Sequence, residues 1–286
     1  MKTGMALEGG AMRGMFTAGV LDVLMENQIE VDGYVGVSAG ACFGCNYKSR
    51  QIGRTIRYNL RFCHDKRLGT FTSWLKCGDL YEPKFCYHDI PFEYDLFDTE
   101  TFRSNPVKFY MGCTNVDTGE PYYYLCEKGD EHDLLYMQAS ASMPLVSKVV
   151  SVDGLNLLDG GVSDSIPIEW LRSIGYERNI VVRTRQEGYR KKNSAFTKAT
   201  CLLLHKYPNL AKTMENRSEH YNHTLDVIAD LERKGEAFVI KPPKEPDVGR
   251  MEHDPAKLQK LYDMGRSEAE KQLEGVKAFL DAARER

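Results

Sequence analysis

Residues 31–40 are Val31-Asp32-Gly33-Tyr34-Val35-Gly36-Val37-Ser38-Ala39-Gly40, and this stretch decides the fold. Its first half is typical of a short apolar strand, and residues 41–47 can begin a helix. The glycines Gly36 and Gly40 let the chain turn sharply, so that the Ser38 hydroxyl projects from a strand-to-helix elbow. The helix N-terminus offers N–H groups and partial positive charge to a developing anion. Serine hydrolases present their nucleophile in this way, but five residues alone also fit a glycine-rich turn with an incidental serine.

A second glycine-rich turn precedes this elbow. Residues 4–7 are typical of a strand, residues 8–14 form the turn, and apolar residues at helical spacing follow as far as Asn27. Strand, turn, helix and second strand within residues 4–40 predict a βαβ unit with parallel strands and a right-handed crossover. Both turns then lie at the carboxyl ends of neighbouring strands, where open α/β sheets place their sites.

Composition narrows the class of protein. The 286 residues carry a formal net charge of −3 and no long basic block, which does not favour nucleic-acid binding. No apolar run approaches the ~18 residues that a membrane-spanning helix needs, so any membrane contact would be peripheral. The eight cysteines are scattered and no secretory signal is present, so we expect reduced thiols and a cytoplasmic protein. His220 and His223 stand at helical spacing without further ligands, and no metal is signalled.

The middle of the chain is rich in aromatic residues. Between residues 50 and 105 the pattern is irregular, and the aromatics there can fill a satellite core, line an apolar substrate cleft, or do both. Regular structure is expected again in strands at residues 108–114, 122–126, 149–152, 156–158, 178–184 and 237–240, and in helices at residues 134–142, 195–206, 210–234 and 255–284.

A serine nucleophile needs a base, and no histidine stands out as one. Three of the seven histidines lie within helical patterns, whereas a Ser-His-Asp enzyme of this type carries its histidine on a late loop. Asp159 is a better candidate, because it ends an apolar strand and precedes Gly160 and Gly161. Its unperturbed pKa of ~3.9 makes it a weak base unless burial raises that value. Taken alone, Asp-Gly also fits an ordinary turn.

Four motifs occur in order along the chain: Gly9-Gly10-Ala11-Met12-Arg13-Gly14, Gly36-Val37-Ser38-Ala39-Gly40, Ala139-Ser140-Ala141-Ser142-Met143-Pro144 and Asp159-Gly160-Gly161-Val162. The set resembles the patatin-like phospholipases, particularly the compact microbial type. That resemblance implies an α/β fold of three layers, α/β/α, with a mainly parallel central sheet. The catalytic domain would span residues 3–185, with residues 50–105 as an aromatic-rich insertion or cap. Residues 186–286 would be a mainly helical C-terminal extension.

The resemblance also implies a chemistry that needs no metal, and no cofactor is expected. Ser38 would be the nucleophile and Asp159 the base of a Ser-Asp dyad that passes through an acyl-enzyme. Gly36 and Gly40 would form the elbow, and Gly160 and Gly161 would complete the base motif. The turn of Gly9, Gly10, Ala11, Met12, Arg13 and Gly14 would supply oxyanion-hole N–H groups, from Gly10, Ala11 or nearby. The substrates would be phospholipids, lysophospholipids or other fatty-acyl esters.

Two positions in the glycine turn raise separate expectations. Arg13 matches the basic residue usual in this family's turn, and a salt bridge that pins the loop is the alternative role. Ala11 replaces the family's middle glycine, and its N–H stays available if its φ angle is negative.

Two other functions remain open at this level. A Ser-His-Asp α/β-hydrolase shares the elbow but not the early glycine turn. A non-catalytic lipid-binding or regulatory protein could keep the fold without the reaction. The sequence predicts no oligomeric state.

Overall fold

The computed structural model describes residues 1–193 and 195–284. Within this part of the chain, eight strands form one sheet in the order β5-β6-β3-β2-β1-β7-β8, with β4 beside β3. The strands are β1 (Thr3–Leu7), β2 (Gly33–Val37), β3 (Lys108–Asn115), β4 (Pro121–Cys126), β5 (Val150–Val152), β6 (Leu155–Asp159), β7 (Arg178–Val182) and β8 (Ala237–Ile240).

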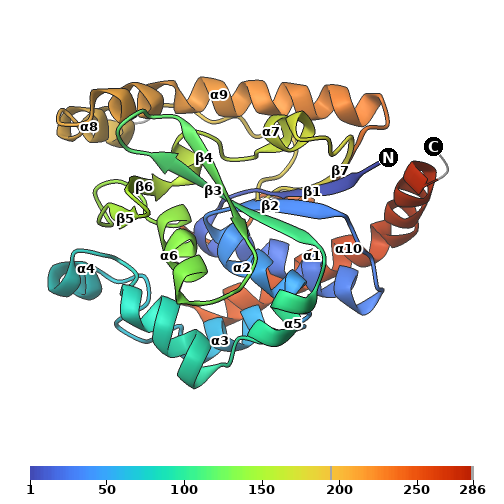
Figure 1. The fold of residues 1–286 in the computed structure, drawn as a ribbon, viewed down its shortest axis with the longest axis horizontal. Coiled ribbons are helices and arrows are strands. Elements are labelled where there is room, and N and C mark those ends of the chain that lie inside the picture. The colour runs from blue at the N-terminus through green and yellow to red at the C-terminus, as the bar shows by residue number, and fades with distance from the viewer. Residues whose placement is uncertain (194, 285–286) are drawn as a thin grey trace.

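Helices cover both faces of this sheet. Figure 1 shows α7, α8 and α9 on one face and α1, α2, α6 and α10 on the other. The helical segments are η1 (Ala11–Gly14), α1 (Met15–Glu26), α2 (Ala39–Lys48), α3 (Arg54–Phe62), α4 (Phe71–Cys77), η2 (Phe85–Tyr94), α5 (Thr99–Ser104), α6 (Glu131–Ser140), η3 (Gly160–Val162), α7 (Ile168–Ser173), α8 (Ala195–Leu203), α9 (Pro208–Arg233) and α10 (Pro255–Arg284). The predicted three-layer α/β/α fold is therefore confirmed.

The centre of the sheet is parallel. Strands β3, β2, β1, β7 and β8 pair in parallel, whereas β4, β5 and β6 join by antiparallel pairing. Every residue of β1 and β2 is buried, as expected for parallel strands with helices on both faces. Leu7 of β1 lies opposite Gly36 of β2. The two strands of the predicted βαβ unit thus end side by side.

Strand β3 brings two other strands end to end. Its partner β4 pairs along residues 109–114, which occupies one edge of β3. The opposite edge is therefore shared by β2, which pairs with residues 108–112, and by β6, which pairs with residues 113–115. Strand β2 ends with Val37 opposite Gly112, and β6 ends with Asp159 opposite Cys113. The residue after Val37 is Ser38, so Ser38 and Asp159 meet beside adjacent residues of β3.

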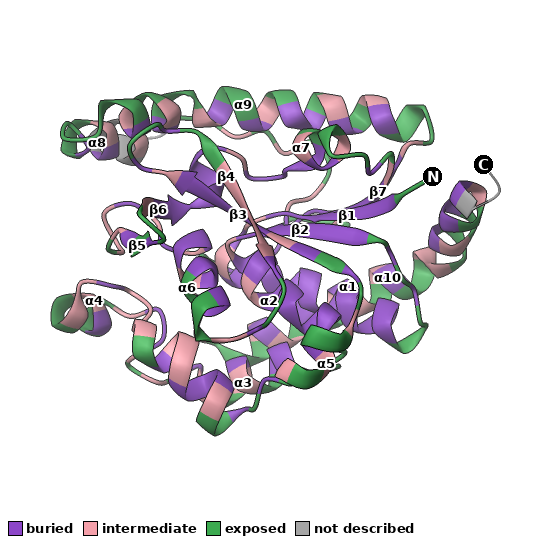
Figure 2. Cartoon of the chain, viewed as in Figure 1, coloured by how far each residue is buried: buried purple, intermediate pink, exposed green. Residues whose placement is uncertain are grey.

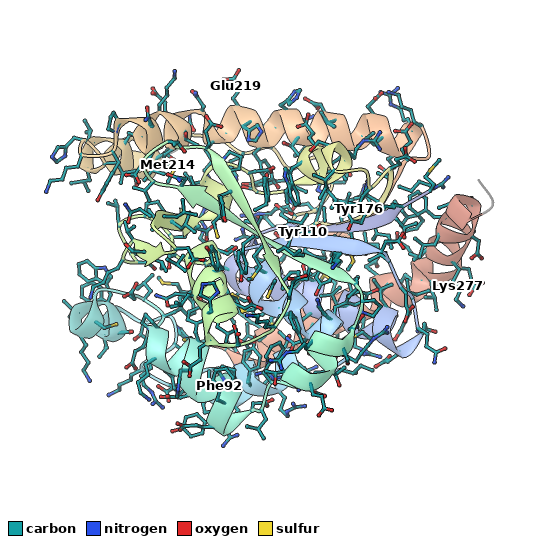
Figure 3. The ribbon with its side chains drawn as sticks, in the orientation of Figure 1. Phe92, Tyr110, Tyr176, Met214, Glu219 and Lys277 are labelled. Atoms are coloured by element: carbon teal, nitrogen blue, oxygen red, sulfur yellow. The ribbon has the colours of Figure 1, made fainter. Side chains whose placement is uncertain are left out.

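The chain after residue 186 takes part in all three layers. Strand β8 pairs with β7 at the edge of the sheet, while α9 and α10 lie on opposite faces (Figure 1). In Figure 2 both helices are green towards solvent and purple towards the sheet. Figure 3 shows Glu219 pointing outward from α9, and Met214 of the same helix is buried. The segment expected to be a mainly helical extension thus supplies an edge strand and a covering helix on each face.

Helices α1 and α10 cross at very short range. A Cβ atom on Gly19 would lie 2.1 Å from the Tyr262 carbonyl oxygen, and one on Gly265 would lie 2.0 Å from that of Phe16. The Tyr262 hydroxyl donates a 2.7 Å hydrogen bond to Asp22 at this crossing. Backbone contact between the helices therefore requires glycine at both positions.

We predict that Gly265→Ala destabilises the protein. The same change in an exposed helix would stabilise it by roughly 0.5–1 kcal/mol, but here the methyl group overpacks the crossing at a cost of about 1–3 kcal/mol. Urea unfolding measures the difference. Gly249→Ala is the control, because no atom of the described residues lies within 4 Å of its new methyl group. A gain in the free energy of unfolding for Gly265→Ala would contradict the close backbone contact between α1 and α10.

Candidate active site

Ser38 lies on a sharp elbow between β2 and α2. Its backbone angles are φ +55° and ψ −121°, a left-handed conformation that costs a non-glycine residue on the order of 1–3 kcal/mol. A Cβ atom on Gly36 would lie 2.3 Å from the Gly40 carbonyl oxygen, and one on Gly40 would lie 2.4 Å from that of Leu7. Only glycine fits at both places. The elbow presents the Ser38 side chain, partly exposed, at the end of the sheet.

The end of α6 holds this elbow in place. The Ser38 amide donates a 3.0 Å hydrogen bond to the Ser140 hydroxyl, which donates a 2.6 Å bond to the Gly112 carbonyl. Two residues further on, the Ser142 carbonyl accepts a 2.8 Å hydrogen bond from the Asp159 amide. Both serines belong to one of the four sequence motifs, but the sequence predicts no role for them. In the structure they tie Ser38 and Asp159 to the end of α6, and Ser140 also bonds this end to Gly112 of β3.

Asp159 is 2% exposed and has its side chain beside Ser38. The Gly161 amide donates a 2.7 Å hydrogen bond to its Oδ1. Burial raises the pKa of Asp159, while a hydrogen bond with the Ser38 side chain and the positive charge of Arg217 lower it. The net pKa lies above the ordinary value, in the direction that makes the carboxylate a stronger base. Gly160 begins η3 and passes close to β3, where a Cβ atom would lie 2.2 Å from the Gly112 carbonyl oxygen.

Within the described part of the chain, no histidine hydrogen-bonds to Ser38 or Asp159. Nδ1 of His220 lies 2.6 Å from the Ser163 carbonyl oxygen, so this nitrogen donates there. His223 lies 3.9 Å from Glu169. The two histidines of the possible metal pair thus have separate partners, and no Ser-His-Asp triad is formed among the described residues.

The glycine turn leaves two amides free near Ser38. The Gly9 amide donates to the Ser165 carbonyl at 3.2 Å, that of Met12 to Arg250 at 3.5 Å and that of Arg13 to Gly10 at 3.2 Å. The N–H groups of Gly10 and Ala11 donate no hydrogen bond among residues 1–193 and 195–284. Gly14 packs against α2, where a Cβ atom would lie 2.8 Å from that of Ala39. Gly10 and Ala11 are therefore the best candidates for oxyanion-hole donors.

The condition stated for Ala11, a negative φ angle, is not met. Its φ angle is +49°, and its N–H is nevertheless available. Ala11 is the first residue of the η1 helix, so its amide has no partner within that helix. The methyl group is tolerated at a cost of roughly 1–2 kcal/mol relative to glycine.

Arg13 does not form the salt bridge considered above as an alternative. Among the described residues it makes no ion pair, and its Nε is buried without a hydrogen-bond partner. Burial and the nearby Arg185 lower the pKa of Arg13 to about 10. Its positive charge is therefore not neutralised within the turn.

A cavity of about 370 Å³ opens beside Ser38. Its wall is mostly apolar and includes Ala11, Met12 and residues from α2 and α6. The aromatic-rich segment contributes a large part of the rest: Tyr58, Leu68, Leu80, Tyr81, Tyr87, Ile90, Pro91 and Phe97. Other aromatics of this segment, Phe85 and Phe102, are fully buried in the core, and Phe71 is exposed. The segment both packs a core and lines the cavity, as the two interpretations of its sequence allowed.

Among the described residues, two groups of side chains have the spacing of metal ligands. They are His88, Asp89 and Glu93, and Asp130, His132 and Asp133. Neither group includes Ser38 or Asp159, and neither lines the cavity. No described helix is both long and apolar enough to cross a membrane.

Comparison with known proteins places this chain in a family. The family model for patatin-like phospholipases matches residues 5–171, and a domain model of unknown function matches residues 207–281. The chain is 32% identical over 191 residues to the Escherichia coli protein named "Uncharacterized protein YjjU", a match that covers 62% of this chain and 50% of that one.

More distant matches extend the comparison. A lysophospholipase named nte1 from Aspergillus fumigatus is 27% identical over 60% of this chain. A patatin-like phospholipase domain-containing protein from Caenorhabditis elegans, ZK370.4, is 26% identical over a similar share. The chain spans only 11% and 13% of these two proteins. The structure of VipD from Legionella pneumophila aligns with 96% of this chain and 67% of its own, with a TM-score of 0.47 and 12% identity.

The family model covers more than half of the chain and includes both Ser38 and Asp159. The chain therefore belongs to the patatin-like phospholipase family.

Proposed function

We propose that this protein is a serine hydrolase of lipid acyl esters, a carboxylic ester hydrolase that works through a Ser38–Asp159 dyad. The observation that carries the proposal is the contact of Ser38 with a buried carboxylate at the mouth of an apolar cavity. Family membership and the relatives named as lysophospholipases support a lipid substrate. Fatty-acyl chains fit the apolar wall, which the aromatic-rich segment largely builds.

The reaction begins with proton transfer from Ser38 to Asp159. The raised pKa of Asp159 improves the match between the base and the serine hydroxyl. The serine oxygen attacks the ester carbonyl, and the N–H groups of Gly10 and Ala11 stabilise the oxyanion of the tetrahedral intermediate. Asp159 returns the proton to the leaving alcohol, which leaves an acyl group on Ser38. Water, deprotonated by Asp159, then releases the fatty acid.

A non-catalytic lipid-binding role is the weaker alternative. Binding alone requires the cavity, but it requires neither a strained serine nor a buried carboxylate beside it. Both features cost stability, and strain that persists in a fold is typically found at functional sites. Peripheral contact with a membrane stays a prediction of the sequence, as does a cytoplasmic location.

We predict that Ser38→Ala and Asp159→Asn each lower kcat for an aryl ester by at least about 10³-fold, since each removes one partner of the proton transfer. We nevertheless expect Asp159→Asn to be at least as stable as the wild type at pH 7. The pKa of Asp159 is higher in the folded than in the unfolded protein, so the ionised carboxylate destabilises the fold at a pH above the unfolded pKa. The neutral amide of asparagine has no such effect. Ester turnover and thermal unfolding are the two measurements.

His220→Ala is the control for a histidine-dependent mechanism. We expect its turnover within about threefold of the wild type, because His220 donates to the Ser163 carbonyl and not to Ser38. A loss comparable to that of Ser38→Ala, or full activity in Asp159→Asn, would contradict the dyad.

We also predict that Ala11→Gly keeps turnover within about threefold. Glycine adopts φ +49° without strain and keeps the N–H in place, although it adds entropy to the unfolded chain. The free energy of unfolding should change by no more than about 1 kcal/mol. Ala11→Val is the contrasting variant, because a β-branched side chain disfavours this φ angle and should lower both activity and stability. A tenfold or larger loss of kcat in Ala11→Gly would show that the methyl group shapes the oxyanion hole.

A further inference from the structure

Five cationic side chains gather around the glycine turn and Asp159. They are Arg13, which lies within the patatin-like match, and four residues that lie after it: Arg185, Lys191, Arg217 of α9, and Arg250 from the loop between β8 and α10. We refer to these five as the basic cluster. Four of its members are half-buried and Arg250 is exposed, so the cluster is open to solvent on one side.

Hydrogen bonds and a ring contact hold two members of the cluster next to the site. Nε of Arg217 donates to the carbonyl of Gly161, two residues after Asp159. Nζ of Lys191 lies 3.4 Å from the Ser165 hydroxyl and 3.9 Å from the centre of the Tyr221 ring.

Arg250 connects the cluster to the cavity. Its carbonyl accepts a hydrogen bond from the Met12 amide, and Arg250 lines the cavity together with Ser38. The cluster thus extends from Asp159 to the cavity rim.

The positive charge of this cluster is not balanced. The carboxylates near its five cations are Glu8, Asp159 and Glu245, and Glu8 already accepts hydrogen bonds from the Thr184 amide and the Tyr221 hydroxyl. Among residues 1–193 and 195–284, Arg185 pairs with the exposed Glu245, while the other four cations form no ion pair. Burial, together with repulsion from neighbouring cations, lowers the pKa of Arg13 and Lys191. An anion bound here would relieve this repulsion.

We propose that the basic cluster is a phosphate-binding subsite, in which Lys191, Arg217 and Arg250 from the chain after residue 186 hold the phosphate of the substrate headgroup. The inference rests on the proposed hydrolase function. Guanidinium groups bind phosphate oxygens through paired hydrogen bonds, and a lysine adds a compact charge.

The covalent structure of a glycerophospholipid agrees with this placement. Its phosphate is attached to the glycerol backbone within a few bonds of the scissile ester. With the acyl chain in the cavity, the phosphate must therefore lie close to Ser38 and outside the apolar wall. Arg250 is the cluster residue that lines the cavity. The other four, Arg13, Arg185, Lys191 and Arg217, lie outside the cavity wall.

Tuning of the base is a different role for two of these residues. Arg217 and Lys191 lower the pKa of Asp159, which would affect every substrate equally. Removing either charge would raise that pKa further and move the acidic limb of the pH–rate profile to higher pH, whether or not the substrate carries phosphate. Phosphate recognition instead changes the preference between substrates.

The test compares two substrates with the same acyl chain, a lysophosphatidylcholine and a monoacylglycerol, in Lys191→Gln and Arg250→Gln. In both variants we expect kcat/KM for lysophosphatidylcholine, divided by kcat/KM for the monoacylglycerol, to fall by roughly tenfold or more. Lys192→Gln, an exposed neighbour, is the matched control and should leave the ratio unchanged. Arg250 is exposed, so its variant tests the subsite without disturbing a buried group. Equal losses on both substrates, or an unchanged ratio, would overturn the subsite.

A binding measurement separates this inference from the hydrolase proposal. Isothermal titration of Ser38→Ala protein with glycerol 3-phosphate and with inorganic phosphate should detect binding that Arg250→Gln and Lys191→Gln weaken. If the protein binds phosphate but hydrolyses no ester, the subsite stands and the hydrolase proposal fails. If it hydrolyses esters but binds no phosphate, only the subsite is overturned. Inorganic phosphate should inhibit lysophosphatidylcholine hydrolysis competitively. Non-competitive inhibition would indicate that the basic cluster binds free phosphate and not the phosphate of the substrate, which would overturn the headgroup assignment.

Discussion

One edge of strand β3 determines where the site forms. Strands β2 and β6 share this edge from opposite directions, and they meet at Gly112 and Cys113. Ser38 follows β2 directly and Asp159 ends β6, so their convergence follows from backbone pairing rather than from side-chain packing. Ser140 strengthens the same junction, because its hydroxyl bonds to both Ser38 and Gly112. A shift in the register of either strand would separate the two residues.

The site concentrates features that oppose folding. Ser38 and Ala11 have positive φ angles, Asp159 is a buried carboxylate, and the basic cluster holds several cations close together. The fully buried strands β1 and β2 and the helices on both faces must offset these costs. Such strain and buried charge are typical of sites that carry out chemistry. The chain after residue 186 belongs to this arrangement, since it supplies α9, α10 and three of the five cations.

Local signals made much of the fold predictable. The glycines around Ser38, the glycine turn and the strand ending at Asp159 each have a short-range pattern, and the structure has a turn or strand end at each. The φ angle of Ala11 could not be predicted, because no local pattern fixes it and the turn also bonds to Arg250, which is distant in the sequence. Lys191, Arg217 and Arg250 carry no motif, so only tertiary packing brings them to the site. Helix α6 begins at Glu131, before the expected residue 134, because the Asp130 side chain caps it.

Labelling with a fluorophosphonate is the most direct measurement of the central claim that Ser38 is an activated nucleophile. The reagent forms a covalent bond with an activated serine, and peptide mass spectrometry locates the adduct. The dyad predicts one adduct at Ser38 in folded protein, none in unfolded protein and much slower labelling in Asp159→Asn. An unlabelled Ser38, or labelling that does not depend on Asp159, would contradict it.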